Sequence, residues 1–226
     1  MVPGVRLVVL GKQGAGKGTQ CVRLSHHYVV PHVSTGDMLR AAVKSGDGLG
    51  SKVKENMDSG ELLGDDLIME MVAERLGEPD ARARGFILDG CPRTTHQAEV
   101  LASLMAPDDI DAAVDIEVPT IQAMRRLAGR RVCVDCGSNY SVSAPPKSGT
   151  WICDVCGGEV IQREDDIEDA ISRRLELYER QTAPLIDWYT SRTQLAKVNG
   201  IGSPDAVLRR IIRSVEDKRQ QRGGSR

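Results

Sequence analysis

Short apolar runs alternate with longer amphipathic stretches along most of the chain. The apolar runs predict β-strands at Val5–Leu10, His32–Val33, Gly85–Leu88, Ala112–Val118 and Leu195–Val198. The amphipathic stretches predict α-helices at Lys17–His27, Met38–Lys44, Asp66–Leu76, Thr95–Met105, Ile121–Ala128, Ile167–Gln181 and Pro204–Asp217. Because strands and helices alternate, we expect an α/β fold with a parallel sheet that is covered by helices on both faces.

Two segments interrupt this alternation. Residues Ser34–Asp65 look helical and contain no run that predicts a strand, and residues Gly129–Asp166 are rich in Cys, Gly and Pro. We therefore expect a single core that carries two insertions.

Composition narrows the class of protein. Apolar residues make up 40% of the 226 residues, which is enough for a core, but Phe86 is the single Phe, so the core must be mainly aliphatic. The net charge of −2 gives no overall basic field for nucleic acid, so local arginines must bind any anion. No apolar stretch approaches the roughly 20 residues of a membrane span, and Met1–Leu10 lacks a signal-peptide pattern. We expect a cytoplasmic protein without nucleic-acid or membrane partners.

A glycine-rich turn follows the first predicted strand directly. Residues Gly11–Thr19 read Gly-Lys-Gln-Gly-Ala-Gly-Lys-Gly-Thr. Such a turn lets backbone N–H groups converge on phosphate oxygens, and Lys17 adds a mobile positive charge for the outer phosphates. The common pattern ends Gly-Lys-[Ser/Thr], whereas Gly18 here separates Lys17 from Thr19. The alternative is a turn without a ligand, but the order of strand, loop and helix favours a phosphate-binding loop.

Four cysteines in the second insertion form two Cys-x-x-Cys pairs. The pairs are Cys133/Cys136 and Cys153/Cys156, sixteen residues apart, and glycine follows each pair. This spacing predicts a structural, tetrahedral zinc site. Two disulfides are the alternative, and the absence of a secretory pattern argues against them. Cys21 lies outside the spacing and is expected to pack on the first helix.

Several acidic and basic residues are candidates for phosphate and magnesium chemistry. Ser34 and Asp37 form a helix-capping pattern that leaves Arg40 free for another role. Asp89 ends a predicted strand, where a carboxylate can hold a Mg²⁺-bound water, and Arg93 follows on a rigid turn. Further arginines flank the second insertion: Arg125, Arg126, Arg130, Arg131, Arg163, Arg173 and Arg174. Each taken alone fits a solvated helix face; together they fit a mobile flap that delivers charge to a polyphosphate.

Together these features resemble an adenylate kinase of the long-lid, zinc-containing bacterial type. The matching stretches are Gly14-Ala-Gly-Lys-Gly-Thr-Gln20, Ser34-Thr-Gly-Asp-Met-Leu-Arg40, Leu88-Asp-Gly-Cys-Pro-Arg93, Gly129-Arg-Arg131, the two cysteine pairs, Gln162-Arg-Glu-Asp-Asp166, Arg173-Arg174 and Thr182-Ala-Pro-Leu185. The resemblance implies the P-loop nucleoside monophosphate kinase fold, with a five-stranded parallel sheet and two mobile inserted subdomains. The core would comprise residues 1–33, 64–128 and 167–226, the AMP-binding insertion 34–63 and the zinc-binding lid 129–166.

The resemblance also implies a reaction and a set of site residues. A monomer would transfer a phosphoryl group in line from Mg·ATP to AMP, giving two ADP. The catalytic charges would be Lys17, Arg93, Arg130, Arg163 and Arg174. ATP would contact Gly14, Ala15, Gly16, Lys17, Gly18, Thr19, Arg126, Arg130, Asn139, Tyr140 and Gly202. AMP would contact Thr35, Arg40, Glu61, Leu62, Leu63, Gly90, Cys91, Pro92, Arg93, Gln97, Arg163 and Arg174. Asp37 and Asp89 would orient Mg²⁺-bound waters, and Cys133, Cys136, Cys153 and Cys156 would bind Zn²⁺.

This chain departs from the family pattern at three places. Gln13 replaces a usual Pro, beside Lys12; Tyr140-Ser141 replaces a common Tyr-His, followed by a shorter stretch; and Cys91 replaces an aromatic residue. Cys91 has two interpretations. It is either a reactive thiol, favoured as thiolate by the nearby Arg93, or a small, buried, inert residue.

Other functions remain as alternatives. A kinase for GMP, CMP or UMP would share most of the motifs, although the long zinc-bearing lid favours AMP. A zinc-ribbon nucleic-acid ATPase would need a basic groove with aromatic residues, which this composition lacks. A GTPase would need an Asn-Lys-x-Asp stretch to read guanine, and the sequence contains none.

Overall fold

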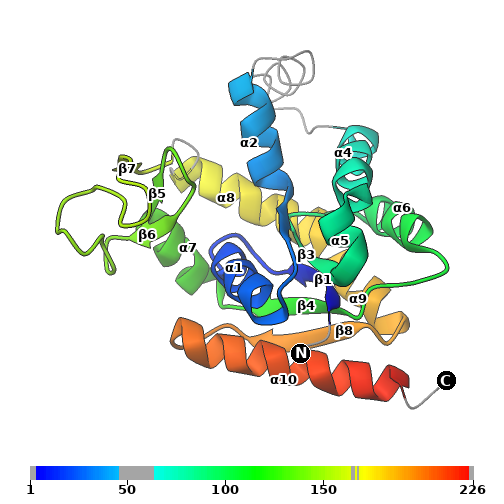
Figure 1. The fold of residues 1–226 in the computed structure, drawn as a ribbon. Helices are drawn as coiled ribbons and strands as arrows, with labels where there is room; N and C mark the ends of the chain where they lie inside the picture. The colour runs from blue at the N-terminus through cyan, green and yellow to red at the C-terminus, as the bar shows by residue number, and fades with distance from the viewer. Residues whose placement is uncertain (1–3, 46–63, 164–165, 167, 224–226) are drawn as a thin grey trace.

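The computed structural model describes residues 4–45, 64–163, 166 and 168–223. Its centre is a five-stranded parallel sheet in the order β2-β3-β1-β4-β8 (Figure 1). The strands are β1 Val5–Leu10, β2 His32–Ser34, β3 Gly85–Asp89, β4 Ala112–Glu117 and β8 Leu195–Asn199. All five predicted strands are therefore confirmed, with ends that shift by at most one residue. Ser34 pairs with Asp89 in the sheet, so β2 extends one residue beyond the predicted strand.

Helices surround this sheet. Their bounds are α1 Lys17–Tyr28, α2 Thr35–Ser45, α4 Asp65–Gly77, α5 Pro79–Arg84, α6 Thr95–Met105, α7 Thr120–Ala128, α8 Glu168–Leu177, α9 Pro184–Ser191 and α10 Pro204–Gly223. The single helix predicted over 167–181 is instead α8 followed by a π-helical turn, η1 Tyr178–Thr182. The short helices α5 and α9 escaped prediction. No helix in these described ranges is both long and apolar enough to cross a membrane.

The core has two layers because side chains of β1 alternate between the faces of the sheet. Val5, Leu7 and Val9 pack with residues of α1 and α10, whereas Val8 and Leu10 pack with residues of α4, α6 and α9. Both layers are mainly aliphatic, as the composition predicts, and helices cover both faces of the sheet.

A second, smaller sheet stands apart from the core, beyond α7 and α8 (Figure 1). It is antiparallel, in the order β6-β5-β7, and consists of β5 Arg130–Cys133, β6 Asn139–Ser141 and β7 Val160–Ile161. Among the described residues, its apolar cluster consists of Cys133, Cys153 and Val160, with Tyr140 against them. A cluster of this size is small for a subdomain that folds on its own.

Candidate active site

The loop after β1 requires glycine at several positions. Gly11, Gly14 and Gly16 all have positive φ angles. A Cβ atom on Gly14 would lie only 2.4 Å from the carbonyl oxygen of Ala123, so this position has no room for a side chain. Helix α1 begins at Lys17, with Gly16 as its N-cap. The loop thus directs a helix N-terminus toward the sheet edge where β1 ends, as the sequence predicts.

Lys17 folds back over this loop. Its Nζ donates to the carbonyl oxygen of Gly11 at 2.6 Å and to that of Lys12 at 3.1 Å. Burial lowers the pKa of Lys17, and the nearby carboxylate of Asp89 opposes this shift. Asp89 ends β3 beside β1, and its Oδ2 lies near Gly18. Two residues predicted from separate motifs therefore lie at one edge of the sheet.

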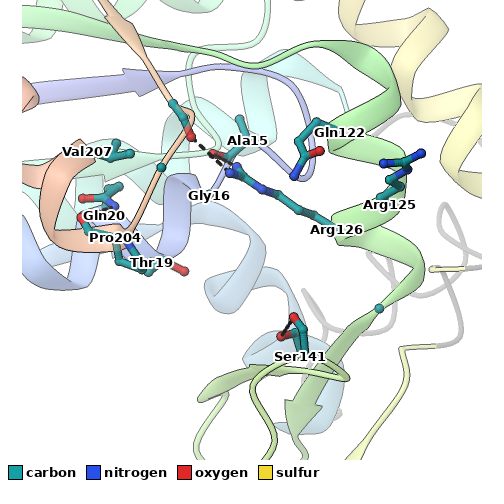
Figure 2. A pocket seen from close by; sticks show the side chains of 14 residues that line it. Ala15, Gly16, Thr19, Gln20, Gln122, Arg125, Arg126, Ser141, Pro204 and Val207 are labelled. Atoms are coloured by element: carbon teal, nitrogen blue, oxygen red, sulfur yellow. Dashed lines mark hydrogen bonds between the residues drawn. The ribbon is translucent and has the colours of Figure 1, made fainter.

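A cavity of about 430 Å³ opens beside the loop (Figure 2). Its lining is Ala15, Gly16, Thr19, Gln20, Gln122, Arg125, Arg126, Gly129, Ser141, Ser143, Gly200, Gly202, Pro204 and Val207. Arg126 reaches across it from α7: its Nη1 donates to Ala15 O at 3.0 Å and its Nη2 to Gly200 O at 3.1 Å. The volume of the cavity suits a small-molecule ligand. Of the residues predicted for ATP, Ala15, Gly16, Thr19, Arg126 and Gly202 line it.

The lid side of this cavity differs from the sequence expectation. Ser141 and Ser143 line the cavity, whereas Asn139 and Tyr140 do not. The hydroxyl of Tyr140 instead lies 3.3 Å from Cys153 Sγ and accepts a hydrogen bond from the Asp154 amide at 2.8 Å. Tyr140 therefore packs with the cysteine cluster. Arg125, one of the arginines expected to flank the second insertion, also lines the cavity. Gln122 was not predicted, although it lies four residues before Arg126 and therefore on the same face of α7.

Two arginines from distant segments converge on one carboxylate. Arg130 pairs with Asp166 through Nε at 2.7 Å and Nη2 at 2.5 Å, and Arg174 Nη1 lies 3.7 Å from the same group. The side chain of Asp166 is fully buried. The backbone carbonyl of Arg163 accepts a hydrogen bond from the Asp166 amide at 3.1 Å, which places Arg163 next to this group. Asp166 ends the Gln162–Asp166 stretch that resembles the family pattern, but the burial of a carboxylate has no local sequence signal.

Several of the residues predicted for AMP lie where β3 ends. A Cβ atom on Gly90, which has positive φ, would lie 2.6 Å from Thr35 Oγ1, so glycine keeps these two segments close. Arg93 Nε donates to the Gly90 carbonyl at 2.8 Å, and the Arg93 amide donates to Gln97 Oε1 at 2.7 Å. Pro92 between them is buried and follows a cis peptide bond. Glu61, Leu62 and Leu63 lie outside the described residues.

Gln97 is held by a small polar network. The Gln97 amide donates to Thr94 Oγ1 at 3.2 Å, and Thr94 and the Gln97 side chain both donate to Asp65, each at 2.6 Å. Thr94 is therefore the N-cap of α6. Gln97 is buried and contacts the Arg93 backbone, so it positions the turn that carries Arg93.

Asp37 and Arg40 form an ion pair on the first turns of α2. The Asp37 amide donates to Ser34 Oγ at 3.2 Å, which matches the predicted capping pattern. Burial alone would raise the pKa of Asp37, but the hydrogen bonds from Arg40 and Ser34 outweigh it and hold this pKa below its usual value. Asp37 is therefore a carboxylate at neutral pH.

The expectation of a reactive Cys91 is wrong. Cys91 is only 1% exposed, and its thiol lies 3.5 Å from Met69 Sδ within the core. Burial raises its pKa to about 12, and the opposing charge of Arg93 is the smaller effect. Cys91 is thus a buried, protonated thiol, as the second interpretation held. Cys21 is buried as expected.

The four lid cysteines lie together. Their Sγ atoms are all within 4.8 Å of one another, with Cys133 and Cys156 at 3.4 Å and Cys136 and Cys153 at 3.5 Å. A disulfide would need about 2.0 Å, whereas a tetrahedral Zn–S geometry places sulfurs about 3.8 Å apart. The thiols are free and their spacing fits a metal ion better than disulfides.

Comparisons with known proteins agree with this geometry. The model of a family described as adenylate kinase matches residues 9–194. The adenylate kinase of Thermodesulfovibrio yellowstonii is 47% identical over 95% of this chain and 100% of its own length. Those of Syntrophobacter fumaroxidans and Desulfitobacterium hafniense (strain DSM 10664 / DCB-2) are 46% and 44% identical, over 92% and 94% of this chain and 98% of their own lengths. With its phosphate loop, parallel sheet and cysteine-bearing lid, the chain belongs to the adenylate kinase family.

Proposed function

We propose that this site performs the reaction Mg·ATP + AMP ⇌ 2 ADP by direct transfer. The observation that supports this best is Lys17, whose ammonium is held by two loop carbonyls near Asp89 at the sheet edge. In the reaction an AMP phosphate oxygen forms a bond to the γ-phosphorus of ATP while the bond to the β,γ-bridging oxygen breaks. AMP already carries an anionic phosphate, so the protein needs no general base; it must align the groups and neutralise charge.

The triphosphate would lie along Gly14–Thr19, with Lys17 on its outer phosphates. The adenosine would occupy the cavity crossed by Arg126, which also contains Gly202. Arg126 currently bonds loop carbonyls, and these bonds are exchanged when a phosphate arrives. On the lid side we assign the cover of ATP to Ser141 and Ser143 in addition to Asn139 and Tyr140, because the Tyr140 hydroxyl is engaged by the cysteine cluster.

AMP would bind just beyond the carboxyl end of β3, held by Thr35, Arg40, Gly90 and Arg93, with Glu61–Leu63, Cys91, Pro92 and Gln97 completing the predicted set. Because the Cys91 thiol is buried, Cys91 would contact AMP through its backbone. Arg130, Arg163 and Arg174 would approach from the lid. Asp166 positions two of them, because it is a buried carboxylate that pairs with both Arg130 and Arg174.

Asp89 and Asp37 suit a magnesium ion that binds through its waters. Mg²⁺ prefers oxygen ligands and keeps several waters, and Asp89 provides a half-buried carboxylate near Gly18 and Lys17. When bound, the ion neutralises phosphate charge during transfer. Asp89 would orient its waters at the loop, and Asp37 would do so from α2.

Two insertions would exclude water by closing over the nucleotides. We assign residues 34–63 to the AMP-binding insertion, 129–166 to the lid, and 1–33, 64–128 and 167–226 to the core. Zn²⁺ in the four-cysteine cluster would stabilise the lid without entering the chemistry, since four thiolates fill a tetrahedral site. All proposed nucleotide contacts come from one chain, which favours a monomer, and the free thiols fit the reducing cytoplasm.

The test compares acceptors and one variant. ADP formation from ATP should be fastest with AMP among AMP, GMP, CMP and UMP. Lys17→Met should reduce the rate by about 10²–10³-fold or more, with an unchanged circular dichroism spectrum, because Lys17 contributes charge rather than packing. Lys197→Met, at an exposed lysine on β8, is the matched control and should retain the rate. A faster reaction with another monophosphate, or near-normal transfer by Lys17→Met, would overturn the assignment.

A further inference from the structure

A second group of metal-ligating side chains lies beneath the phosphate loop. Cys21 belongs to α1, His32 to β2 and Asp89 to the end of β3. The ligand atoms of these three residues lie within 4.8 Å of one another. Nothing in the phosphoryl transfer derived above uses Cys21 or His32.

The contacts among these residues leave one ligand atom, the Nε2 nitrogen of His32, without a hydrogen-bond partner in the described ranges. The Cys21 thiol is fully buried, and its sulfur lies within 4.8 Å of an Asp89 carboxylate oxygen. His32 Nε2 is buried and makes no hydrogen bond within the described part of the chain, although Asp89 Oδ2 lies 3.5 Å away. A buried ring nitrogen without a partner costs free energy unless a ligand satisfies it. The nitrogen, sulfur and oxygen are therefore close enough to one another to share a ligand.

We propose that Cys21, His32 and Asp89 form a second metal site, for a thiophilic or borderline divalent cation such as Zn²⁺ or Co²⁺. One thiolate, one imidazole and one carboxylate suit these ions, whereas Mg²⁺ prefers oxygen ligands alone. A tetrahedral zinc site needs ligand atoms about 3.3–3.6 Å apart, so each side chain has to move by little. Three protein ligands leave the fourth position open, which distinguishes this site from the closed four-cysteine cluster.

Occupation of this site would inhibit transfer. Asp89 cannot coordinate the cation and at the same time hold Mg²⁺ waters for ATP. This consequence rests on the role proposed above for Asp89, whereas binding of the cation does not. Zinc or a similar ion would inhibit the kinase when it binds Asp89 in place of the Mg²⁺-bound waters.

Binding can be tested on the full chain with its four-cysteine cluster loaded with zinc. Titration with Co²⁺ should add one equivalent per chain with a thiolate-to-cobalt charge-transfer band, while elemental analysis shows that the zinc stays in place. Cys21→Ala should abolish this band, and His32→Gln should weaken cobalt binding at least tenfold. His26→Gln, at an exposed histidine of the same helix, is the control and should behave as the unmodified protein does. Circular dichroism checks that each variant folds.

The inhibition is measured separately, with each variant compared with its own rate in chelator. Free Zn²⁺ should inhibit ADP formation by the unmodified protein, and Cys21→Ala should need at least tenfold more zinc for the same effect. Absence of an additional cobalt equivalent, or a band that persists in Cys21→Ala, would overturn the site. A site that binds cobalt but leaves zinc inhibition equal in all variants would refute the inhibitory role alone.

Discussion

Replacing the buried Asp115 by Asn should stabilise the protein above pH 6. Asp115 lies in β4 beside Leu10, the last residue of β1, and is 6% exposed. Burial raises its pKa from 3.8 to about 6, and the repulsion of Glu117 adds to this, against the attraction of Lys197, Lys17 and Lys12. Tyr178 of η1 also faces this group, and its own pKa is raised by burial and by Asp115.

The sign of the effect follows from linkage. A carboxyl whose pKa is higher in the folded protein than in the unfolded chain favours folding while it is protonated. This contribution is complete below pH 3.8 and is lost as the pH rises through 6. The full loss is about 3 kcal/mol at 1.36 kcal/mol per pKa unit, and about 1.4 kcal/mol of it falls between pH 5.0 and 7.5. Asn does not titrate, so the Asp115→Asn variant has no such loss of stability as the pH rises.

Urea unfolding at pH 5.0 and 7.5 measures this directly. The free energy of unfolding of Asp115→Asn, relative to the unmodified protein, should rise by roughly 1.4 kcal/mol between the two pH values. Glu117→Gln, at an exposed carboxylate of the same strand, is the control and should show a much smaller change with pH. A difference that is independent of pH, or that shrinks as the pH rises, would refute the reasoning.

Three further results are expected. A thiol reagent at neutral pH should leave Cys91 unmodified in the folded protein with and without AMP, because burial keeps it protonated; peptide mapping that finds it labelled contradicts this. Removing metal from the cysteine cluster should lower Tm and increase hydrogen exchange first in β5–β7, and elemental analysis showing less than about one metal per chain as purified would argue against the zinc site. An analogue that joins ATP to AMP should reduce the radius of gyration in solution scattering, and tight binding without compaction would count against closure of the two insertions.

The sheet and the phosphate loop are predictable because their signals are local. A strand buried on both faces is a continuous apolar run, and Val5–Leu10 keeps that pattern. The glycines of the loop are required by positive φ angles and by the close approach of Ala123. The cysteine pairs can also be recognised from the sequence, because Cys-x-x-Cys pairs at this spacing are typical of a metal site. By contrast the small lid sheet has strands of two to four residues, too short for periodicity to detect.

Residues that act through burial are not predictable in this way. Asp166 reads as one acid among several in a charged stretch, yet the fold removes it from solvent and sets two arginines on it. Cys21 and His32 lie in separate segments, and only the pairing of β2 with β3 and the packing of α1 bring them to Asp89. They come together only when the sheet is assembled, and the distances between them along the sequence do not predict it.

Cys91 shows why charge alone misleads at such an edge. A neighbouring arginine stabilises a thiolate, so the sequence of the turn favours a reactive cysteine. The same turn, however, packs its side chain against Met69 inside the core, and the cost of removing a thiolate from water exceeds the attraction of Arg93. Lys17 obeys the same order of effects, since burial lowers its pKa more than Asp89 raises it. For Cys91 and Lys17 burial decides the direction of the pKa shift, and neighbouring charges only moderate it. Burial depends on tertiary packing, so the chemistry of these groups becomes readable only once the fold is known.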